Sequence, residues 1–452
     1  MEPLQSYLDD KIARAKKALA ALESCTQEQV DAFAKACAKA VCDNGEKLAR
    51  HAVDETKMGV YEDKVAKNKN KAKLIWWSLR NKPSVGIIER NPDAGIVKIA
   101  KPVGVVGAIT PVTNPIVTPM SNAMFALKGR NPIIVAPHPK AVSCGIETVR
   151  YMNEALKKLG APEDSIQIMD EPSLELTQML MRAVDVIIAT GGMGMVRAVY
   201  GSGKPALGVG AGNVQCLVDD DVDYAAAAKM IVTGRAFDNG IICTGEQSAI
   251  VPRRDFDRIL ELFGENGGYV VPDAQRAALR DAVFPGGKMN PAWVGQSAAS
   301  IAKAAGISMP QGAKVLVVEA EGVDDVLGSE KMFPVLTAYR YDTWEQAIEI
   351  ARANLDKIGK GHSISIHSHN RLHVEEAALK TEVSRIVVNQ ICSTSGGGSY
   401  QNGLTPTNTL GCGSWGNNSL SENLSYFHLI NISRIANVLE DRTAPPEEKI
   451  WA

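Results

Sequence analysis

Apolar residues recur at helical spacing through the first eighty positions of this chain. A capping-box sequence, TQEQ at positions 26–29, precedes one clear example of the pattern. The apolar positions that follow it are Val30, Phe33, Cys37 and Val41. Steps of three and four residues place side chains on one face of a helix, so the N-terminal part is predicted to be a set of packed helices.

The pattern changes between residues 86 and 101. Two short runs rich in Ile and Val flank a polar turn, NPDAG, at positions 91–95. Such a sequence is typical of a β-hairpin. A hairpin that projects from the body is suited to pairing with another subunit, which makes this segment a candidate oligomerisation arm.

From residue 131 onward, short apolar runs alternate with helical patterns. The predicted strands are 133–136, 166–168 and 184–189, and the predicted helices are 146–159 and 173–182. This alternation predicts a parallel, doubly wound sheet whose ligands bind at the carboxyl ends of its strands. The sequence TGGMG at 190–194 allows a phosphate to approach a helix N-terminus, although its spacing differs from G-x-G-x-x-G.

A glycine-rich segment at 208–213 separates this region from a second one. Its alternating glycines indicate backbone packed closely against a ligand or against another strand. The elements predicted after it are strands at 214–218, 315–319 and 364–367 and a helix at 224–237 that leads to Cys243. The fold class is therefore α/β.

The composition is that of an ordinary globular protein. The 452 residues are 45% hydrophobic and 22% charged, with a formal net charge of −2, and this length accommodates two or three domains. No basic stretch indicates a nucleic-acid partner, and no apolar run is long enough for a membrane span. The chain begins with a charged helical pattern rather than a signal sequence, so a cytoplasmic location is expected.

The eight cysteines are scattered without a C-x-x-C pair, so neither a metal site nor a disulfide scaffold is expected. One of them, Cys243, lies between an Asn-Gly turn and Gly245. A thiol on such a bend is able to approach a carbonyl carbon closely, with neighbouring amides free to face the oxygen. The alternative is a buried cysteine that acts as a small apolar side chain, and the local sequence leaves both open.

Asn114 lies between Pro111 and Pro115, which fix the backbone around it. A rigid loop of this kind presents the side-chain amide in one direction. Asn before proline is also a common turn residue, so a purely structural role is the alternative.

Six separated sequences, taken together, resemble CoA-acylating aldehyde dehydrogenases. They lie at 110–119, 136–140, 239–248, 330–335, 361–363 and 409–416, and the likeness covers essentially the whole chain. Positions 58–67 and 421–424 are most similar to acylating succinate-semialdehyde dehydrogenases, while acylating sulfoacetaldehyde and acetaldehyde dehydrogenases are similar too. The resemblance favours the nucleophilic role of Cys243.

The resemblance implies the aldehyde dehydrogenase fold, an α/β architecture of three parts. A doubly wound dinucleotide-binding domain comprises 1–85 and 102–213, and an α/β catalytic domain with Cys243 comprises 214–417. The oligomerisation arm and C-terminal segment comprise 86–101 and 418–452. The implied assembly is a homodimer or homotetramer.

The resemblance also implies that the Cys243 thiolate adds to an aldehyde, while the Asn114 side chain and the Cys243 amide stabilise the oxyanion. Hydride transfer to NADP or NAD leaves a thioester, which CoA cleaves. Hydrolytic relatives carry a water-activating glutamate where this chain has Gly208, which disfavours release of a free acid. Glu246, the nearest carboxylate in sequence, is expected to be structural. A non-catalytic nucleotide-binding relative is disfavoured because both the cysteine and the asparagine are present.

Cofactor contacts are implied at several separated positions. They are Pro137, His138 and Lys140 near the adenosine ribose, Thr190, Gly191 and Gly192 near the pyrophosphate, Gly210 in the glycine-rich segment, and Glu330 at the nicotinamide-side ribose. His138 and Lys140 are able to accept a 2′-phosphate, and the alternative for Lys140 is a solvated lysine at a helix start, so NADP and NAD both stay open. His362 either borders the cofactor or CoA channel or is a satisfied structural histidine.

The loop at 390–395 matches the segment that lines the aldehyde pocket in relatives. Its hydroxyl groups are suited to an anionic tail such as that of succinate semialdehyde, and they belong to Ser393, Thr394 and Ser395. Arg235, in the helix that leads to the cysteine, is a candidate to complete this anion site. The alternative for Arg235 is a position on the helix surface.

Overall fold

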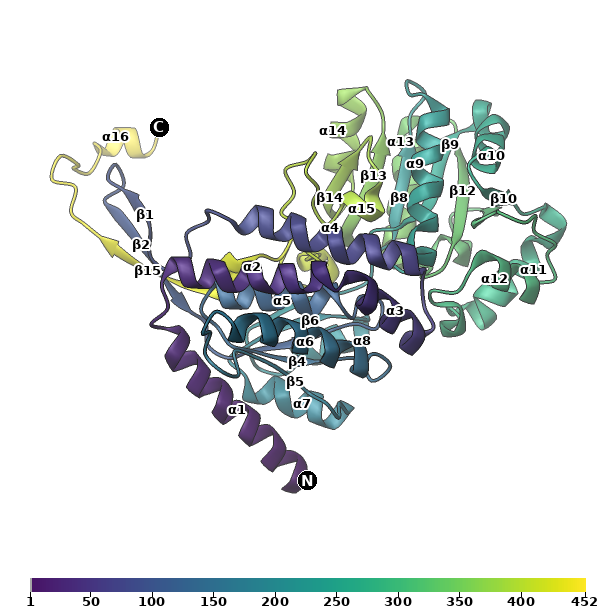
Figure 1. The fold of residues 1–452 in the computed structure, drawn as a ribbon. Helices are drawn as coiled ribbons and strands as arrows, with labels where there is room; N and C mark the ends of the chain where they lie inside the picture. The colour runs from purple at the N-terminus through teal and green to yellow at the C-terminus, as the bar shows by residue number, and fades with distance from the viewer. Residues whose placement is uncertain (1) are drawn as a thin grey trace.

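The computed structural model describes residues 2–452, which form three sheets surrounded by helices (Figure 1). Two sheets are parallel and build the body of the molecule, and the third is a small antiparallel sheet that projects from it. Within this described part of the chain, no helix has the length and apolar character needed to cross a membrane.

The first parallel sheet has five strands in the order β5-β4-β3-β6-β7. Its strands are β3 (Val106–Ile109), β4 (Ile133–Ala136), β5 (Ile166–Ile168), β6 (Val186–Thr190) and β7 (Ala206–Val209). Side chains along these strands alternate between two hydrophobic cores, one on each face of the sheet. In β3, for example, Val106 and Ala108 pack on one face and Ile109 on the other. Both faces are covered, which explains the continuous apolar runs of these strands.

Helices from the N-terminal half cover both faces of this sheet. One face carries α2 (Gln27–Asp43), α3 (Gly45–Thr56), α4 (Tyr61–Leu79), α5 (Val117–Lys128) and α6 (Val142–Lys157). The other carries α1 (Glu2–Leu22), α7 (Leu174–Ala183) and α8 (Met193–Tyr200). The helices predicted for the first eighty residues are confirmed, and Thr26 and Gln29 form the expected capping box.

The second parallel sheet has seven strands in the order β10-β11-β12-β9-β8-β13-β14. Its strands are β8 (Val214–Val218), β9 (Glu246–Pro252), β10 (Gly268–Val270), β11 (Val315–Glu319), β12 (Val335–Tyr341), β13 (Gly361–His367) and β14 (Val383–Val388). The helices of this region are α9 (Tyr224–Ala236), α10 (Phe256–Glu265), α11 (Asp273–Val283), α12 (Ala298–Ala304), α13 (Trp344–Lys357), α14 (Arg371–Lys380) and the short α15 (Cys392–Ser395). The glycine-rich segment 210–213 joins the two parallel sheets.

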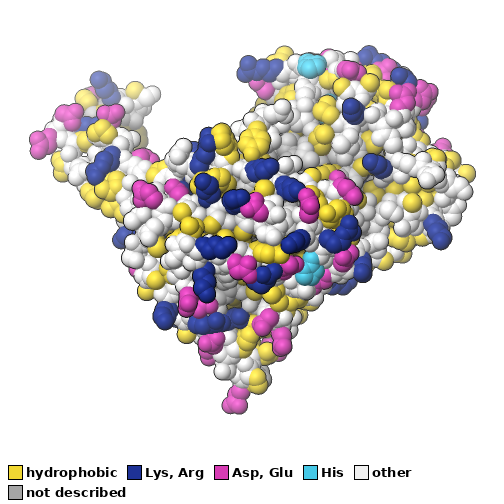
Figure 2. Space-filling view, in the orientation of Figure 1, with side chains coloured by type: hydrophobic (Ala, Val, Ile, Leu, Met, Phe, Trp, Pro, Cys, Tyr) yellow, Lys and Arg dark blue, Asp and Glu magenta, His cyan; other side chains and the backbone are white. Residues whose placement is uncertain are grey.

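A three-stranded antiparallel sheet stands away from the body (Figure 1). β1 (Gly86–Asn91) and β2 (Ile96–Pro102) form the predicted hairpin, and β15 (Ile430–Ala436) pairs with β2 along its length. The chain ends after α16 (Glu447–Ile450) beside this arm. Figure 2 shows a notch between arm and body, with basic and acidic side chains interspersed over the face in view. A role of the arm in contact between subunits stays a prediction.

The segment before β15 belongs to the body rather than to the arm. Leu420, Leu424 and Leu429 are buried in the core of the first parallel sheet. The segment predicted as C-terminal, 418–452, is therefore divided in the structure. Its first part helps to close the body, and the arm begins at about Ile430.

Candidate active site

Two cavities meet at the Cys243 thiol. The first has a volume of about 580 Å³ and lies between the two parallel sheets, and the second has a volume of about 450 Å³ and lies against α4. The residues that line both are Asn114, Cys243, Asn408 and Leu410. Because the thiol borders both cavities, ligands in each are able to reach it.

The bend that carries Cys243 has an unusual backbone. Asp238, Asn239 and Gly240 have φ values of 52°, 53° and 68°, so three successive residues adopt the left-handed conformation that Asp, Asn and Gly tolerate best. The amide of Gly245 closes the turn by donating to the carbonyl of Ile242 at 2.8 Å. The amide of Cys243 donates no backbone hydrogen bond within the described chain, which leaves it available to an oxyanion.

The surroundings of the Cys243 thiol make it harder to ionise than a free thiol. Burial raises its pKa to about 12, the nearby Glu330 carboxylate adds to the effect, and the Arg385 guanidinium opposes it. A thiol of this kind becomes a nucleophile only when a neighbouring group accepts its proton.

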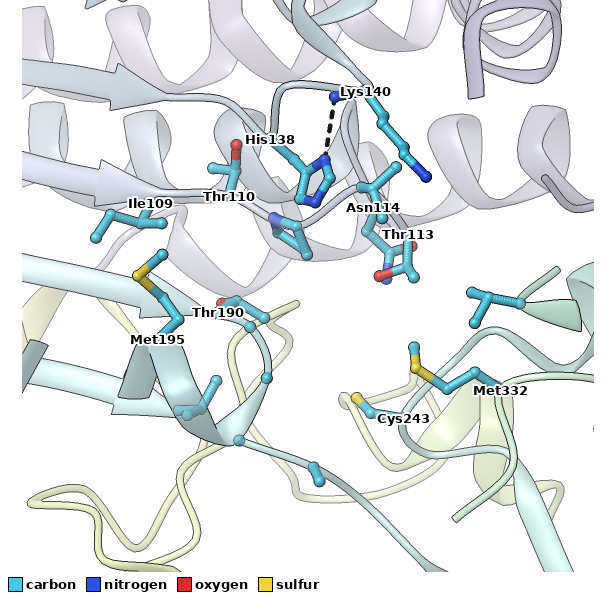
Figure 3. A pocket seen from close by; sticks show the side chains of 18 of the residues that line it. Ile109, Thr110, Thr113, Asn114, His138, Lys140, Thr190, Met195, Cys243 and Met332 are labelled. Atoms are coloured by element: carbon cyan, nitrogen blue, oxygen red, sulfur yellow. Dashed lines mark hydrogen bonds between the residues drawn. The ribbon is translucent and has the colours of Figure 1, made fainter. Parts of the chain in front are cut away.

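Asn114 is held in one orientation by a lysine. The ammonium of Lys67 donates to Oδ1 of Asn114 at 2.6 Å. An ammonium has no acceptor, so the atom that faces it is the amide oxygen, and the amide nitrogen is left to donate elsewhere. Figure 3 shows Thr113 and Asn114 across the cavity from Cys243 and Met332. The role of the Asn114 amide in stabilising an oxyanion stays a prediction.

Lys67 is itself fixed by a buried carboxylate from the cysteine bend. Asp238 Oδ2 accepts from the ammonium groups of Lys67 at 2.7 Å and of Lys64 at 3.0 Å, and Oδ1 accepts from the amide of Val60 at 2.9 Å. Burial acts to raise the pKa of Asp238, but the two lysines outweigh it and hold the pKa below its usual value. This network ties Asn114 and the Cys243 bend to the same helix, α4.

All eight residues expected to contact the dinucleotide line the first cavity. Gly192 is the N-cap of α8, no side chain caps that helix, and a Cβ at Gly192 meets no atom within 4 Å. The amides of a first helical turn lack intrahelical partners and bind phosphate well. The segment from Thr190 to Gly192 is thus open to a pyrophosphate.

The ends of the first cavity carry a carboxylate and a basic pair. Glu330 Oε1 accepts the amide hydrogen of Gly212 at 3.1 Å, and burial raises the pKa of this carboxyl to about 7. At the other end, the amide of Lys140 donates to Nδ1 of His138 at 3.1 Å (Figure 3), and the Lys140 side chain is exposed. The roles of these groups in binding ribose hydroxyls or a phosphate stay predictions.

His362 is not a satisfied structural histidine. Its side chain is 1% exposed, lines the first cavity, and leaves Nδ1 without a partner in the described structure. Burial, with Arg385 adding to it, keeps the pKa of His362 well below its usual value, so the imidazole is neutral. A Cβ at Gly212 would lie 2.1 Å from the Cys243 carbonyl oxygen and 3.1 Å from Cε1 of His362, so the glycine lets the imidazole pack beside the cysteine.

The hydroxyl-rich loop reaches the second cavity with two of its three residues. Ser393 and Thr394 line this cavity, but Ser395 does not, because its Oγ donates to the Ile391 carbonyl at 2.6 Å. The prediction that Ser395 contacts the substrate is therefore wrong. This hydroxyl instead stabilises the helical turn of α15.

Arg235 neither contacts the cavities nor lies on a helix surface. It is fully buried, and its guanidinium donates to the carbonyls of Glu246 at 3.1 Å and Lys331 at 2.5 Å, and also to that of Phe333. The two terminal nitrogens are thus used by backbone carbonyls, and Nε, which has no partner in the described structure, is buried away from both cavities. The substrate role predicted for Arg235 is thus wrong, and the side chain joins β9 to the segment before β12.

Two basic residues that sequence reasoning missed line the second cavity, Lys67 and Lys71. With Lys64 they follow the spacing i, i+3, i+7, which places all three on one face of α4. Buried residues such as Ala72 and Ile75 share the helix, and this spacing was the available signal.

The two remaining residues discussed from sequence are structural. Glu246 lines neither cavity and accepts the amide hydrogen of Cys392 at 2.6 Å, which agrees with the role expected for it. Gly208 lies in β7, where a Cβ would be 3.1 Å from the Tyr200 ring. A side chain at this position would therefore point at the Tyr200 ring.

Comparison with known proteins agrees with this arrangement. The general pattern of the aldehyde dehydrogenase family matches residues 5–403. The chain is 52% identical over 447 residues to succinate-semialdehyde dehydrogenase (acetylating) from Clostridium kluyveri, with 98% of each protein covered. An acetylating aldehyde dehydrogenase from Geobacillus thermoglucosidasius has a similar structure, with a TM-score of 0.94 and 35% identity over 98% of this chain and 99% of that chain. A propionaldehyde dehydrogenase from Rhodopseudomonas palustris, solved with bound CoA and an acylated cysteine, gives a TM-score of 0.86 and 29% identity over 96% of this chain and 98% of that chain.

Proposed function

Since the chain belongs to the aldehyde dehydrogenase family, we propose that it interconverts succinate semialdehyde, CoA and NADP or NAD with succinyl-CoA and the reduced cofactor. The observation that carries the proposal is the meeting of two cavities at one thiol. One cavity suits a dinucleotide, and the other offers basic and hydroxyl groups to a small aldehyde. The likeness to the Clostridium kluyveri relative favours succinate semialdehyde, with sulfoacetaldehyde and acetaldehyde as alternatives.

The first step needs the Cys243 sulfur as an anion. Two groups in the same cavity are candidates to accept the thiol proton: Nδ1 of His362, which has no partner in the described structure, and the Glu330 carboxylate, whose pKa burial raises to about 7. The sulfur bonds to the aldehyde carbon, and the carbonyl oxygen becomes negative. The Asn114 amide and the Cys243 N–H stabilise that oxygen, and donors of this kind contribute about 3 kcal/mol each.

The residues of the first cavity fit a nicotinamide dinucleotide. The N-terminus of α8 would hold its pyrophosphate, Glu330 a ribose hydroxyl, and the pair His138 and Lys140 its adenosine ribose. When bound, the nicotinamide accepts a hydride from the carbon attached to Cys243. That carbon is then a thioester carbonyl, still held by the oxyanion donors.

Transfer to CoA completes the cycle. No carboxylate is among the lining residues of the second cavity, and Gly208 stands where hydrolytic relatives carry a water-activating glutamate, which disfavours attack by water. A thiol ionises near neutral pH and needs less assistance. The base that took the Cys243 proton first releases it to solvent, which accounts for the proton that the oxidation yields. It then accepts the proton of the CoA thiol, whose sulfur attacks the thioester carbon, and Cys243 leaves as a thiolate that recovers this proton.

Omission of CoA tests this function directly. The wild-type enzyme with succinate semialdehyde and cofactor is expected to release one equivalent of reduced cofactor per subunit and then to stop, because the thioester has no acceptor. Rapid-mixing absorbance of the reduced cofactor measures the burst, and mass spectrometry locates the acyl group on Cys243. Later addition of CoA serves as the control, since it should restart turnover. Continuous release of free succinate without CoA contradicts the proposal and indicates a hydrolytic enzyme.

Cofactor choice is tested at Lys140. Lys140→Ala is expected to raise KM for NADP about tenfold and KM for NAD much less, since a charged hydrogen bond to a 2′-phosphate is lost with NADP alone. Lys158→Ala, an exposed lysine just after the other end of α6, is the matched control. Equal effects of Lys140→Ala on both cofactors would assign that side chain to the solvated surface.

A further inference from the structure

The second cavity carries charge of one sign. Its charged lining residues are Lys67 and Lys71, both from α4, and its lining includes no Asp or Glu among the residues described. The cavity also borders Cys243 and Asn114, the groups that handle the aldehyde carbon and its oxygen. An aldehyde bound here therefore extends its remaining atoms into a basic chamber.

The two lysines differ in what already neutralises them. Lys67 is bonded to Asp238 and to the Asn114 amide oxygen. Lys71 donates to the Gly397 carbonyl at 3.0 Å, and it forms no ion pair anywhere in residues 2–452. Its remaining N–H groups are free to bind a ligand.

The position of Lys71 suits the length of a short aldehyde acid. It follows Lys67 by four residues, one helical turn or about 6 Å along α4. Lys67 marks the Asn114 end of the cavity, where the aldehyde oxygen is held. In succinate semialdehyde three carbon–carbon bonds separate the aldehyde carbon from the carboxylate carbon, a span comparable with this step along the helix.

A second unused donor lies in the same chamber. Ser393 is 5% exposed, lines the cavity, and its Oγ has no partner in the described structure. Thr244 Oγ donates to the Ser393 carbonyl at 3.1 Å, which fixes this part of the loop. A buried donor without an acceptor is costly, so the site favours a ligand that supplies one.

Burial lowers the pKa of Lys71 to about 8, with Lys67 adding to the effect. A desolvated ammonium gains more from an anion than a solvated one does. A bound anion would therefore raise the pKa of Lys71 again and keep the side chain charged. This agrees with the position of Lys71 in the cavity lining.

We propose that Lys71 and Ser393 form the subsite that binds the anionic end of the aldehyde and so determine substrate class. The proposal rests on the function above, in that the ligand is the aldehyde that Cys243 attacks. Lys71 replaces Arg235, which is fully buried and lines neither cavity, as the cationic partner of the substrate. Carboxylate and sulfonate aldehydes share this chemistry, whereas acetaldehyde and butyraldehyde leave both donors unpaired.

Lys71→Met tests the subsite through selectivity. The ratio of kcat/KM for succinate semialdehyde to kcat/KM for butyraldehyde, which carries a methyl group in place of the carboxylate, is expected to fall about 100-fold. Lys73→Met is the matched control, because Lys73 is an exposed residue of the same helix, and it should leave the ratio unchanged. An unchanged ratio in Lys71→Met overturns the proposal.

Ser393→Ala is a second variant, which removes a single hydroxyl. It is expected to lower the same ratio of kcat/KM values about tenfold. It decides the matter if Lys71→Met proves unstable in thermal unfolding. A ratio for Ser393→Ala equal to that of the wild type then counts against the subsite.

A binding measurement separates failure of the subsite from failure of the proposed function. Succinate itself carries the anion but no aldehyde, and it should protect Cys243 from alkylation by N-ethylmaleimide in the wild type and not in Lys71→Met. Peptide mass spectrometry reads the modification at Cys243. Protection without acyl transfer leaves the subsite standing and removes the proposed function. Acyl transfer without protection removes the subsite and leaves the proposed function standing.

Discussion

Replacing Cys243 with serine is expected to lower CoA-dependent turnover at least about ten-thousandfold, the largest effect of any single substitution in this chain. A hydroxyl ionises far less readily than a thiol, and burial here already raises the pKa of the thiol to about 12. A serine hydroxyl in this cavity therefore passes its proton to a neighbouring base less readily still than the thiol does. The measurement is kcat/KM at saturating CoA.

Cofactor binding separates lost chemistry from lost structure in this variant. Serine has nearly the size of cysteine, so the first cavity keeps its shape, and fluorescence titration should give a Kd for the dinucleotide close to that of the wild type. Cys42→Ser is the matched control, because Cys42, in α2, is partly buried like Cys243 and lines neither cavity. Retention of most of the activity by Cys243→Ser would end the thioester mechanism.

Asp238→Asn is expected to destabilise the native state by about 3 kcal/mol or more, because it leaves the buried ammonium groups of Lys64 and Lys67 without a countercharge. Asn tolerates the left-handed backbone at this position, so the substitution tests charge rather than strain. Activity should fall as well, since Lys67 orients Asn114. Urea unfolding at neutral pH measures the free energy of unfolding.

The pH dependence gives this prediction a direction. The native pKa of Asp238 lies below its usual value, so its contribution to stability is present at neutral pH and is lost as pH falls through the native pKa. The difference between wild type and variant should therefore shrink in acid. Asp43→Asn, which breaks the exposed pair with Lys39, is the control and should leave the unfolding curve unchanged. If Asp238→Asn also leaves the free energy of unfolding unchanged, the two lysines need no countercharge.

Local patterns were sufficient for the order and type of most elements. Strands such as 133–136 and 214–218 are apolar on both faces, and helices such as α2 carry their own start signal in the capping box at Thr26. Boundaries that depend on distant residues were not predictable. α6 begins at Val142, four residues before the predicted start, where Glu55 accepts the amide hydrogens of Ser143 and Cys144 at 2.8 Å.

Most of the lining of the first cavity expected to bind the dinucleotide was also predictable from the sequence. In parallel sheets the carboxyl ends of neighbouring strands meet at one edge, so residues that follow β4, β6 and β7 must come close together. The structure brings Pro137, Thr190 and Gly210 to one cavity for this reason. The resemblance added Glu330 to that set, and the structure places it in the same lining.

The sequence by itself thus determined the α/β class, the hairpin arm, the bend that carries Cys243 and the edge of the sheet where a dinucleotide fits. Only the tertiary structure decided which charged side chain faces the second cavity. Helical spacing places residues on a common face but does not say what that face meets. Arg235 and Lys71 both lie on helices near the cysteine, yet one packs against carbonyls and the other against a cavity. That choice depends on contacts between segments more than 90 residues apart, such as Arg235 with Phe333 and Lys67 with Asp238, which the spacing along one helix does not encode.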